Sequence, residues 1–170
     1  YLQDWLLLEA DVDWRLDPVR GGASRVIADI GTHWIDLAEM TAGRKLEAVA
    51  AQVGHLHRRP TEDHAGMLLR LEGGIQGTFA VSQAAGGHRG DMELSLDGSA
   101  ASATWRKERP DELWLGTRAE GLTRITREGD LVSPAARQLA ALPAGPNESR
   151  RNLLAAAYAA IIGDDRPPAA

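Results

Sequence analysis

Cysteine is absent from the 170 residues of this chain. Disulfide bonds, a thiolate nucleophile and cysteine-ligated zinc are therefore excluded from it. The chain also lacks an apolar run long enough to span a membrane, and Tyr1–Trp14 carries acidic side chains where a secretory signal would carry basic ones. We therefore expect a cytoplasmic protein that makes no membrane contact.

Basic residues are few, 19 against 24 acidic ones, which gives a net charge of -5, and no run of lysine and arginine forms a basic patch. Nucleic-acid binding is therefore not expected. Lys45 and Lys107 are the only lysines, and both fall in segments that we predict to be loops. A desolvated catalytic lysine, if the chemistry needs one, must come from another segment.

Two familiar catalytic motifs are missing as well. No glycine-rich loop stands between a strand and a helix, and no downstream acid is placed to bind a ribose, so the chain has no recognisable dinucleotide loop. The G-x-S-x-G nucleophile elbow of hydrolases does not occur either. A nucleotide would have to be held mainly by groups outside this chain.

The residues that are present suit one ordinary globular domain. Hydrophobic residues make up 44% of the chain and charged residues 25%. Alternating apolar residues and turn signals between Leu46 and Thr126 predict successive β-hairpins, with Glu72-Gly73-Gly74 as the strongest turn. Helices are predicted over residues 28–43 and 148–162, an irregular segment over 131–146 and a frayed tail over 164–170. The fold class is therefore α+β, an open and mainly antiparallel β-sheet with helices packed on one face.

The first helix carries the candidate site. At about 100° per residue, Asp29, His33 and Asp36 share one stripe of this helix. Apolar residues form the opposite side, namely Val26, Ile27, Ile30, Trp34, Leu37 and Ala38. Ser24 is placed to cap the helix, and Gly43 to end it.

The stripe has three interpretations. It can be a solvated face in which Arg25 and Asp29 form an ordinary i,i+4 ion pair. The same trio could instead hold a divalent ion. In acid–base chemistry, His33 would accept a proton, an adjacent carboxylate would orient its ring, and carboxylates would bind neighbouring hydroxyls, which suits a sugar or polyol.

Other residues offer weaker candidates. Gln3, Trp14 and Arg15 can do more than pack, Arg15 as a planar fork for a carboxylate or phosphate, although tryptophans such as Trp5 and Trp14 are more often core or interface residues. His55 and His57 are predicted to lie on one face of a strand that extends to Arg58. With His64 nearby, they are a weak candidate for zinc.

Several segments together resemble a known family. YLQDWL (1–6), DVDWR (11–15), GGASRVIADIGTHWIDLAEMTAG (21–43), TEDHAGMLLRLEGGIQGTFAVSQ (61–83) and WRKERPDELWLG (105–116) are similar to the C-terminal substrate domain of the glucose–fructose oxidoreductase and inositol dehydrogenase family of NAD(P)-dependent oxidoreductases. The D-I-G-x-H-x-x-D segment is the most specific of these blocks. Departures include Gly90, where the family often has asparagine, and a shortened loop over 142–148.

The resemblance implies a substrate-binding and oligomerisation domain over residues 1–170, with a Rossmann domain before residue 1 that binds NAD or NADP and supplies a lysine. It also implies that Asp29 and His33 are catalytic and that Asp36 binds substrate hydroxyls. We expect Gln3 and Arg15 to contact substrate, and Trp14 and Arg15 the cofactor. The expected partners are a small hydroxylated substrate, the Rossmann domain and further copies of the chain, which associate through the sheet face.

The resemblance also implies a fragment that is inactive by itself. We expect His33, Asp29 and Asp36 to project together into a sheltered cavity. Two alternatives stay open: a non-catalytic dimerisation or ligand-binding domain of the same fold, and a metal-dependent sugar-modifying enzyme.

Overall fold

The computed structural model describes residues 1–127, 129, 133 and 146–163. The chain divides into two compact units. The first comprises Tyr1–Leu94 with Arg106–Glu108, and the second the remainder. The predicted irregular segment 131–146 and the tail 164–170 fall almost entirely outside the described residues.

The first unit contains a five-stranded sheet with the order β2-β3-β4-β1-β5. Its strands are β1 (Leu2–Gln3), β2 (Leu46–Gly54), β3 (His64–Leu71), β4 (Ile75–Ser82) and β5 (Arg89–Asp91). All pairs are antiparallel except β1 with β4. The mainly antiparallel sheet is therefore confirmed. The two short strands β1 and β5 were not predicted, because neither is long enough to show an alternating pattern.

The hairpin of β3 and β4 is the regular centre of this sheet. Leu71 pairs with Ile75 across the turn Glu72–Gly74, and the pairing continues to His64 and Ser82. Gly73 has a φ of 79°, a left-handed value that favours glycine. The turn prediction is thus confirmed.

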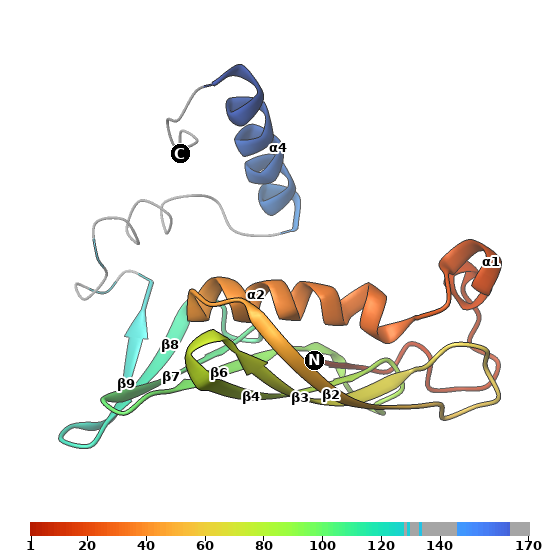
Figure 1. Cartoon of the computed structure of the whole chain (residues 1–170), viewed down its shortest axis with the longest axis horizontal. Helices are drawn as coiled ribbons and strands as arrows, with labels where there is room; N and C mark the ends of the chain where they lie inside the picture. Colours follow the sequence, from red (N-terminus) through yellow and green to blue (C-terminus); the bar gives the residue numbers. More distant parts are fainter. Residues whose placement is uncertain (128, 130–132, 134–145, 164–170) are drawn as a thin grey trace. The chain divides into compact units, whose positions relative to one another are not determined.

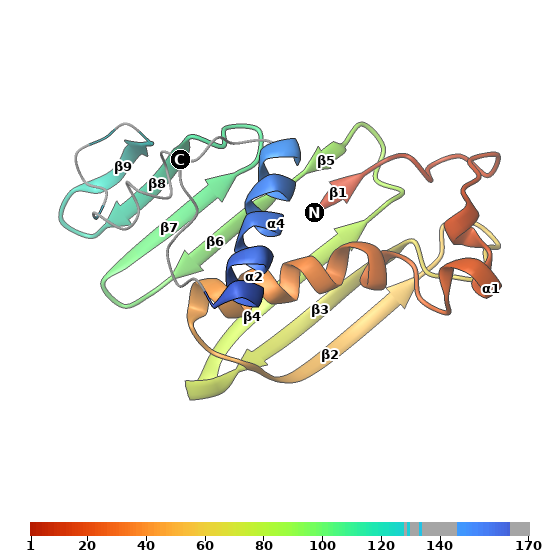
Figure 2. The same ribbon diagram turned by 90° about the horizontal axis from the view of Figure 1, so that it is seen from above.

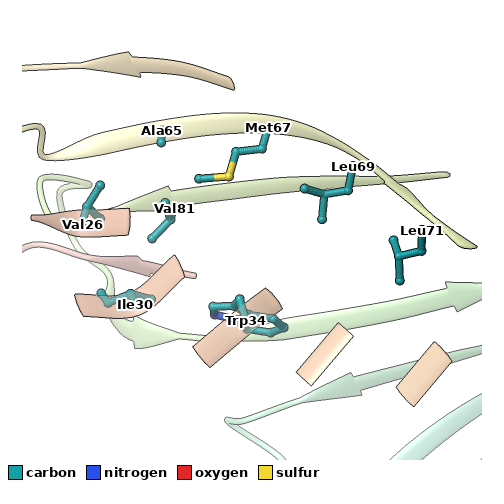
Figure 3. Close-up of a cluster of buried hydrophobic side chains, with 8 residues drawn as sticks. All are labelled: Val26, Ile30, Trp34, Ala65, Met67, Leu69, Leu71 and Val81. Carbon is teal, nitrogen blue, oxygen red and sulfur yellow. The ribbon is translucent and has the colours of Figure 1, made fainter. Parts of the chain in front are cut away.

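Helix α2 (Thr32–Ala42) lies across one face of this sheet, and within the first unit no described residue covers the other face of β2–β4 (Figures 1 and 2). In β3 every second residue is buried and points toward the helix. The core joins both elements, as Figure 3 shows, and consists of Val26, Ile30, Trp34, Ala65, Met67, Leu69, Leu71 and Val81. The predicted apolar side of the helix is therefore confirmed.

The start of the helix differs from the prediction. Residues Ile27–Gly31 form a π-helical turn before α2 begins. The cap is the carboxylate of Glu62, whose Oε1 accepts hydrogen bonds from the backbone N–H groups of Arg25 at 2.9 Å and Ile27 at 3.2 Å. Ser24 donates its hydroxyl hydrogen to the same oxygen at 2.6 Å, so the prediction that Ser24 caps the helix is wrong. Gly43 ends the helix with left-handed dihedral angles, as predicted.

Two short helical turns precede α2, and neither was predicted. A 3-10 turn covers Trp14–Leu16, and α1 covers Pro18–Gly21. Asp13 and Asp17 cap them by accepting hydrogen bonds from the backbone N–H groups of Arg15 and Val19. Neither turn is long enough to produce a helical period in the sequence.

The second unit includes most of a four-stranded sheet, with the order β6-β7-β8-β9. These strands are β6 (Glu93–Asp97), β7 (Ala101–Arg106), β8 (Glu112–Thr117) and β9 (Gly121–Thr126), and all lie within the segment predicted to form hairpins. The strands thus form two sheets rather than the single meander expected. Helix α4 (Pro146–Ile162) confirms the second predicted helix. No helix among the described residues is long and apolar enough to cross a membrane.

Candidate active site around Asp29

Asp29 lies in the π-helical turn at the start of α2, and its carboxylate is held from three directions. Oδ2 accepts a hydrogen bond from Nε2 of Gln83 at 2.8 Å and lies 3.6 Å from Nη2 of Arg25. Oδ1 lies 4.0 Å from Nε of Arg15. The side chain of Asp29 remains 34% exposed, so a small molecule could still reach it.

Asp29 faces Gln83 from within the π-helical turn. In a π-helix the backbone bond runs from residue i to residue i+5, so the side chains at i and i+4 no longer align as they do in an α-helix. Gly31 at the end of this turn is buried, and a Cβ there would lie 3.7 Å from the ring of Phe79 in β4. The helix therefore approaches the sheet closely where Asp29 meets the residue that follows β4.

Arg25 supplies a buried positive charge behind Asp29. Its side chain is 2% exposed, and its guanidinium lies 4.4 Å from the centre of the Trp5 ring, within the range of a cation–π contact. Burial lowers the pKa of Arg25, while the charge of Asp29 opposes that shift. The predicted ion pair of Arg25 and Asp29 is confirmed, but it is not the solvated pair that the sequence suggested.

Several buried polar atoms in and beside this ion pair make no hydrogen bond. Within the described part of the chain, Nε and Nη2 of Arg25 and Oε1 of Gln83 make no hydrogen bond. A buried, unpaired polar atom costs about 1–3 kcal/mol. Polar atoms of this kind call for an explanation beyond packing.

Arg15 and Trp14 form the exposed rim of the site. The guanidinium of Arg15 stacks 4.7 Å from the centre of the Trp14 ring, and Asp13 lies 3.4 Å from Nη1 of Arg15. The backbone N–H of Arg15 also lowers the pKa of Asp13, so the carboxylate that restrains Arg15 is stabilised in its charged form. Trp14 is 52% exposed, so it is not the core residue that the composition favoured.

His33 and Asp36 lie further along the helix and are exposed. The side chain of His33 makes no hydrogen bond or ion pair within the described residues, so the expected orientation of its ring by Asp29 is not seen. The carboxylate of Asp29 is bound by Gln83 instead. Asp36 borders a shallow cavity of about 310 Å³ at the far end of α2. The expected sheltered cavity shared by all three side chains is therefore not formed by the described residues alone.

Gln3 lies in β1 beside β5. Its Oε1 accepts a hydrogen bond from the Tyr1 hydroxyl at 2.9 Å. Burial raises the pKa of the Tyr1 hydroxyl, and the charges of Asp29 and Asp91 raise it further. The Tyr1 hydroxyl is therefore close enough to sense the carboxylate of Asp29. A Cβ at Gly90 would lie 3.0 Å from the same hydroxyl, so a larger residue there would change this polar pair.

The three candidate zinc histidines have separate structural roles. His55 and His57 lie beyond the end of β2 at Gly54, so the prediction of a strand to Arg58 is wrong. Nδ1 of His55 contacts the carbonyl oxygen of Thr61 at 2.9 Å, and Nδ1 of His64 contacts Oδ1 of Asp63 at 2.8 Å. No group of three potential metal ligands is found among the described residues.

Gln83, Arg25 and Trp5 complete the site but were not predicted as site residues. Gln83 is 54 positions from Asp29 in the sequence. The available signal was a polar residue directly after an alternating apolar strand, and that signal is common at strand ends. The composition favours a packing role for Trp5, and its contact with Arg25 does not follow from sequence spacing.

Comparison with known proteins gives a consistent result. Residues 1–104 match the family model described as the GFO/IDH/MocA C-terminal domain. The chain is 30% identical over 118 residues to "Uncharacterized oxidoreductase YfiI" of Bacillus subtilis (strain 168), a match that covers 66% of this chain and 30% of the relative.

Solved structures show the same fold. An inositol dehydrogenase homolog from Azotobacter vinelandii, complexed with NAD+, has a TM-score of 0.67 and 28% identity over 72% of this chain and 32% of its own. The same homolog, complexed with NADH and myo-inositol, has a TM-score of 0.69 and 25% identity over 79% and 35%. An oxidoreductase from Sinorhizobium meliloti reaches 0.77 with 27% identity over 97% and 45%. The chain therefore spans about a third to a half of these relatives.

Proposed function

The chain belongs to the Gfo/Idh/MocA family of oxidoreductases through its C-terminal domain, and on that basis we propose that it is the substrate domain of an NAD(P)-dependent dehydrogenase. Its substrate would be a sugar, a polyol or a related hydroxylated compound. The observation that carries this proposal is a partly exposed Asp29 carboxylate, held at one oxygen by Gln83 and backed by a buried arginine. The myo-inositol in the complex of the Azotobacter vinelandii homolog supports the substrate class.

Each site residue of this chain has its own role in the proposed reaction. The imidazole of His33, exposed one turn beyond Asp29, takes the proton of the reacting hydroxyl as the carbon loses its hydride. Asp29 accepts a hydrogen bond from a substrate hydroxyl and fixes the substrate against the helix. Asp36 accepts from a further hydroxyl, and Gln3 and Arg15 complete the polar surface around the substrate. Two carboxylates on one exposed side of the helix suit a substrate with several hydroxyl groups.

The residues present also fit one end of a dinucleotide. The exposed ring of Trp14 and the guanidinium of Arg15 offer an aromatic surface next to a positive charge, which suits a nicotinamide ring or a phosphate. When bound, the nicotinamide accepts or donates the hydride. The chain has no dinucleotide loop, so we propose that a Rossmann domain preceding residue 1 binds most of the cofactor, covers the exposed His33 and supplies a lysine. The isolated chain is then expected to be inactive.

We also propose that the uncovered face of β2–β4 binds a second copy of the chain. Side chains on this face are small or apolar around Leu68, which is 62% exposed. Ala50 and Thr78 flank Leu68 on the neighbouring strands, as the pairing register shows. An exposed leucine among small side chains favours association.

The test is an assay of the protein that contains this chain together with the proposed Rossmann domain. Wild-type protein should reduce NAD or NADP with at least one member of a sugar and polyol panel, measured by nicotinamide absorbance with and without a chelator. His33→Ala should lower kcat by about 10²-fold or more, because general acid–base catalysis contributes on that scale.

His64→Gln is the matched control, since His64 is a half-exposed histidine on another element and glutamine can still donate to Asp63. Its turnover should remain near wild type. Unchanged turnover in His33→Ala would remove His33 from the mechanism. Absence of turnover with every substrate would favour the non-catalytic domain, and turnover lost with the chelator would favour the metal-dependent enzyme.

A further inference from the structure

We propose that Gln83 is a positioning residue for Asp29. Its side-chain amide holds Oδ2 of the carboxylate, so that Oδ1 is kept available to accept a hydrogen bond from a substrate hydroxyl. The chemical role rests on the proposed function, whereas the positioning itself is a structural statement that can be tested separately.

Gln83 is fixed in place from both sides of its backbone. Its N–H donates to the carbonyl of Asp63 at 2.8 Å, and its carbonyl accepts from the N–H of Leu6 at 2.9 Å. The residue is fully buried, with 0% of its surface exposed. The amide therefore reaches Asp29 from an anchored position, which is what a positioning group requires.

The direction of the amide is also determined by charge. Nε2 donates to Oδ2 of Asp29 at 2.8 Å. The opposite orientation would place Oε1 of Gln83 against the carboxylate, oxygen against oxygen. Because a donor facing a carboxylate is a charge-assisted hydrogen bond, the observed orientation is strongly favoured. Gln83 thus selects one rotamer of Asp29.

The two oxygens of Asp29 are consequently unequal. Oδ2 is occupied by Gln83, with Arg25 at 3.6 Å. Oδ1 makes no hydrogen bond to any described residue and has Arg15 Nε at 4.0 Å beside it. Oδ2 is therefore bound by the protein, whereas Oδ1 can accept a hydrogen bond from a substrate hydroxyl beside Arg15.

A simple packing role does not account for Gln83. Its Oε1 is buried without a partner among the described residues, and an apolar side chain of the same length would fill the space without that cost. The unpaired carbonyl oxygen follows from aiming the amide nitrogen at Asp29. The amide donor of Gln83, and not the volume of its side chain, is therefore the property that this position requires.

The positioning is tested first in the 170-residue chain. Gln83→Met keeps the length of the side chain and removes the donor, while Gln76→Met makes the same change at an exposed position of β4. Three-bond couplings of the Asp29 Hβ protons report its rotamer. We expect one rotamer in wild type and in Gln76→Met, and averaged rotamers in Gln83→Met. An Asp29 rotamer that is already averaged in wild type, or unchanged in Gln83→Met, would overturn the proposal.

The consequence for catalysis is tested in the protein that includes the Rossmann domain. Gln83→Glu keeps the shape but donates only when protonated, so its kcat/KM should be about tenfold below wild type near neutral pH, and the deficit should narrow as the pH is lowered. Gln83→Met should show a similar deficit at every pH. A role in packing alone predicts that Gln83→Met, which keeps the length of the side chain, retains the kcat/KM of wild type, and that result would overturn the proposal.

The two parts of the test separate this inference from the proposed function. If wild-type protein turns over no hydroxylated substrate, the dehydrogenase proposal fails, and the rotamer measurement still decides whether Gln83 positions Asp29. If turnover occurs and both Gln83 variants match wild type, the dehydrogenase proposal stands and the positioning role is wrong.

Discussion

Glu62 shows how one buried carboxylate supports the site from outside it. Its exposed fraction is 7%, and its Oε1 accepts from Ser24 and from the first free N–H groups of the helix. Burial alone would raise the pKa of Glu62, but the hydrogen bonds from Ser24 and the backbone outweigh it, so the pKa lies below its ordinary value. The charged form is therefore stabilised by folding.

The first prediction follows from the sign of that shift. A carboxylate with a depressed native pKa contributes stability that is fully present above its ordinary pKa, about 4.3 for glutamate, and is lost as the pH falls through the native value. Glu62→Gln should lower the free energy of unfolding by about 1–2 kcal/mol at neutral pH, the scale of a lost helix cap. Urea denaturation should show that this difference shrinks below about pH 4.

Glu9→Gln, a change at an exposed position, serves as the control and should follow the wild-type curve. A constant difference between Glu62→Gln and wild type across the acidic range would show that the charge of Glu62 does not stabilise the helix start.

At this scale, prediction from sequence succeeds for residues that act within one element. Asp29 and Arg25 are four positions apart, and their ion pair follows from helical spacing. Glu62 and Gln83 contact residues that lie 37 and 54 positions away in the sequence, and no local pattern predicts such contacts. The choice of Ser24 as the cap was wrong for that reason: the local candidate was outcompeted by a carboxylate from a distant loop.

Short turns place the exposed rim of the site. The 3-10 turn Trp14–Leu16 and α1 bring Arg15 toward Asp29, and Gly21 at the end of α1 packs directly on the backbone of Arg15. A Cβ at Gly21 would lie 2.8 Å from the carbonyl carbon and 2.9 Å from the Cα of Arg15. Because these are backbone atoms, a side chain here requires the whole turn to move.

The second prediction concerns this close approach. Gly21→Ala should displace Arg15 from Asp29 and raise KM for substrate or cofactor by about three- to tenfold in the dehydrogenase assay, since interactions of charged groups at partly exposed sites are worth about 1 kcal/mol. Gly77→Ala is the control, because its added methyl group would meet Leu69 at an ordinary 3.7 Å. A KM for Gly21→Ala equal to that of Gly77→Ala would show that this turn does not contribute to the binding of substrate or cofactor.

Prediction at the scale of elements depends on length. The hairpin of β3 and β4 and helix α2 each run long enough to show a period, and their positions agree with the structure. The two-residue strand β1 and the four-residue helix α1 show none. The π-helical turn was missed because its residues fit an ordinary helical pattern, and only the backbone hydrogen bond from the N–H of Thr32 to the carbonyl of Ile27 distinguishes it.

At the scale of the molecule, the resemblance to a known family predicted more than the periodicity of the sequence did. Periodicity gave the class of fold and the antiparallel sheet, while the family was identified from blocks spread over most of the chain. The pattern could not show that the strands divide into two sheets, because strand partners are set by register and packing that lie far apart in the sequence. The pattern also could not show that His33 is exposed, because its exposure depends on what packs against the helix.

The uncovered face of β2–β4 provides the last prediction. Pairing of Ala50 with Leu68 and of Leu68 with Thr78 places these three side chains in one row, on the face opposite the helix. Leu68→Asp puts a charge at the centre of this face, where burial against a second copy would desolvate it at a cost of several kcal/mol. Wild type should therefore sediment as an oligomer and Leu68→Asp as a monomer. Val19→Asp, a change at a 94% exposed position on α1, should leave the oligomer intact. A monomeric wild type, or an oligomer that survives Leu68→Asp, would show that this face is not where copies of the chain meet.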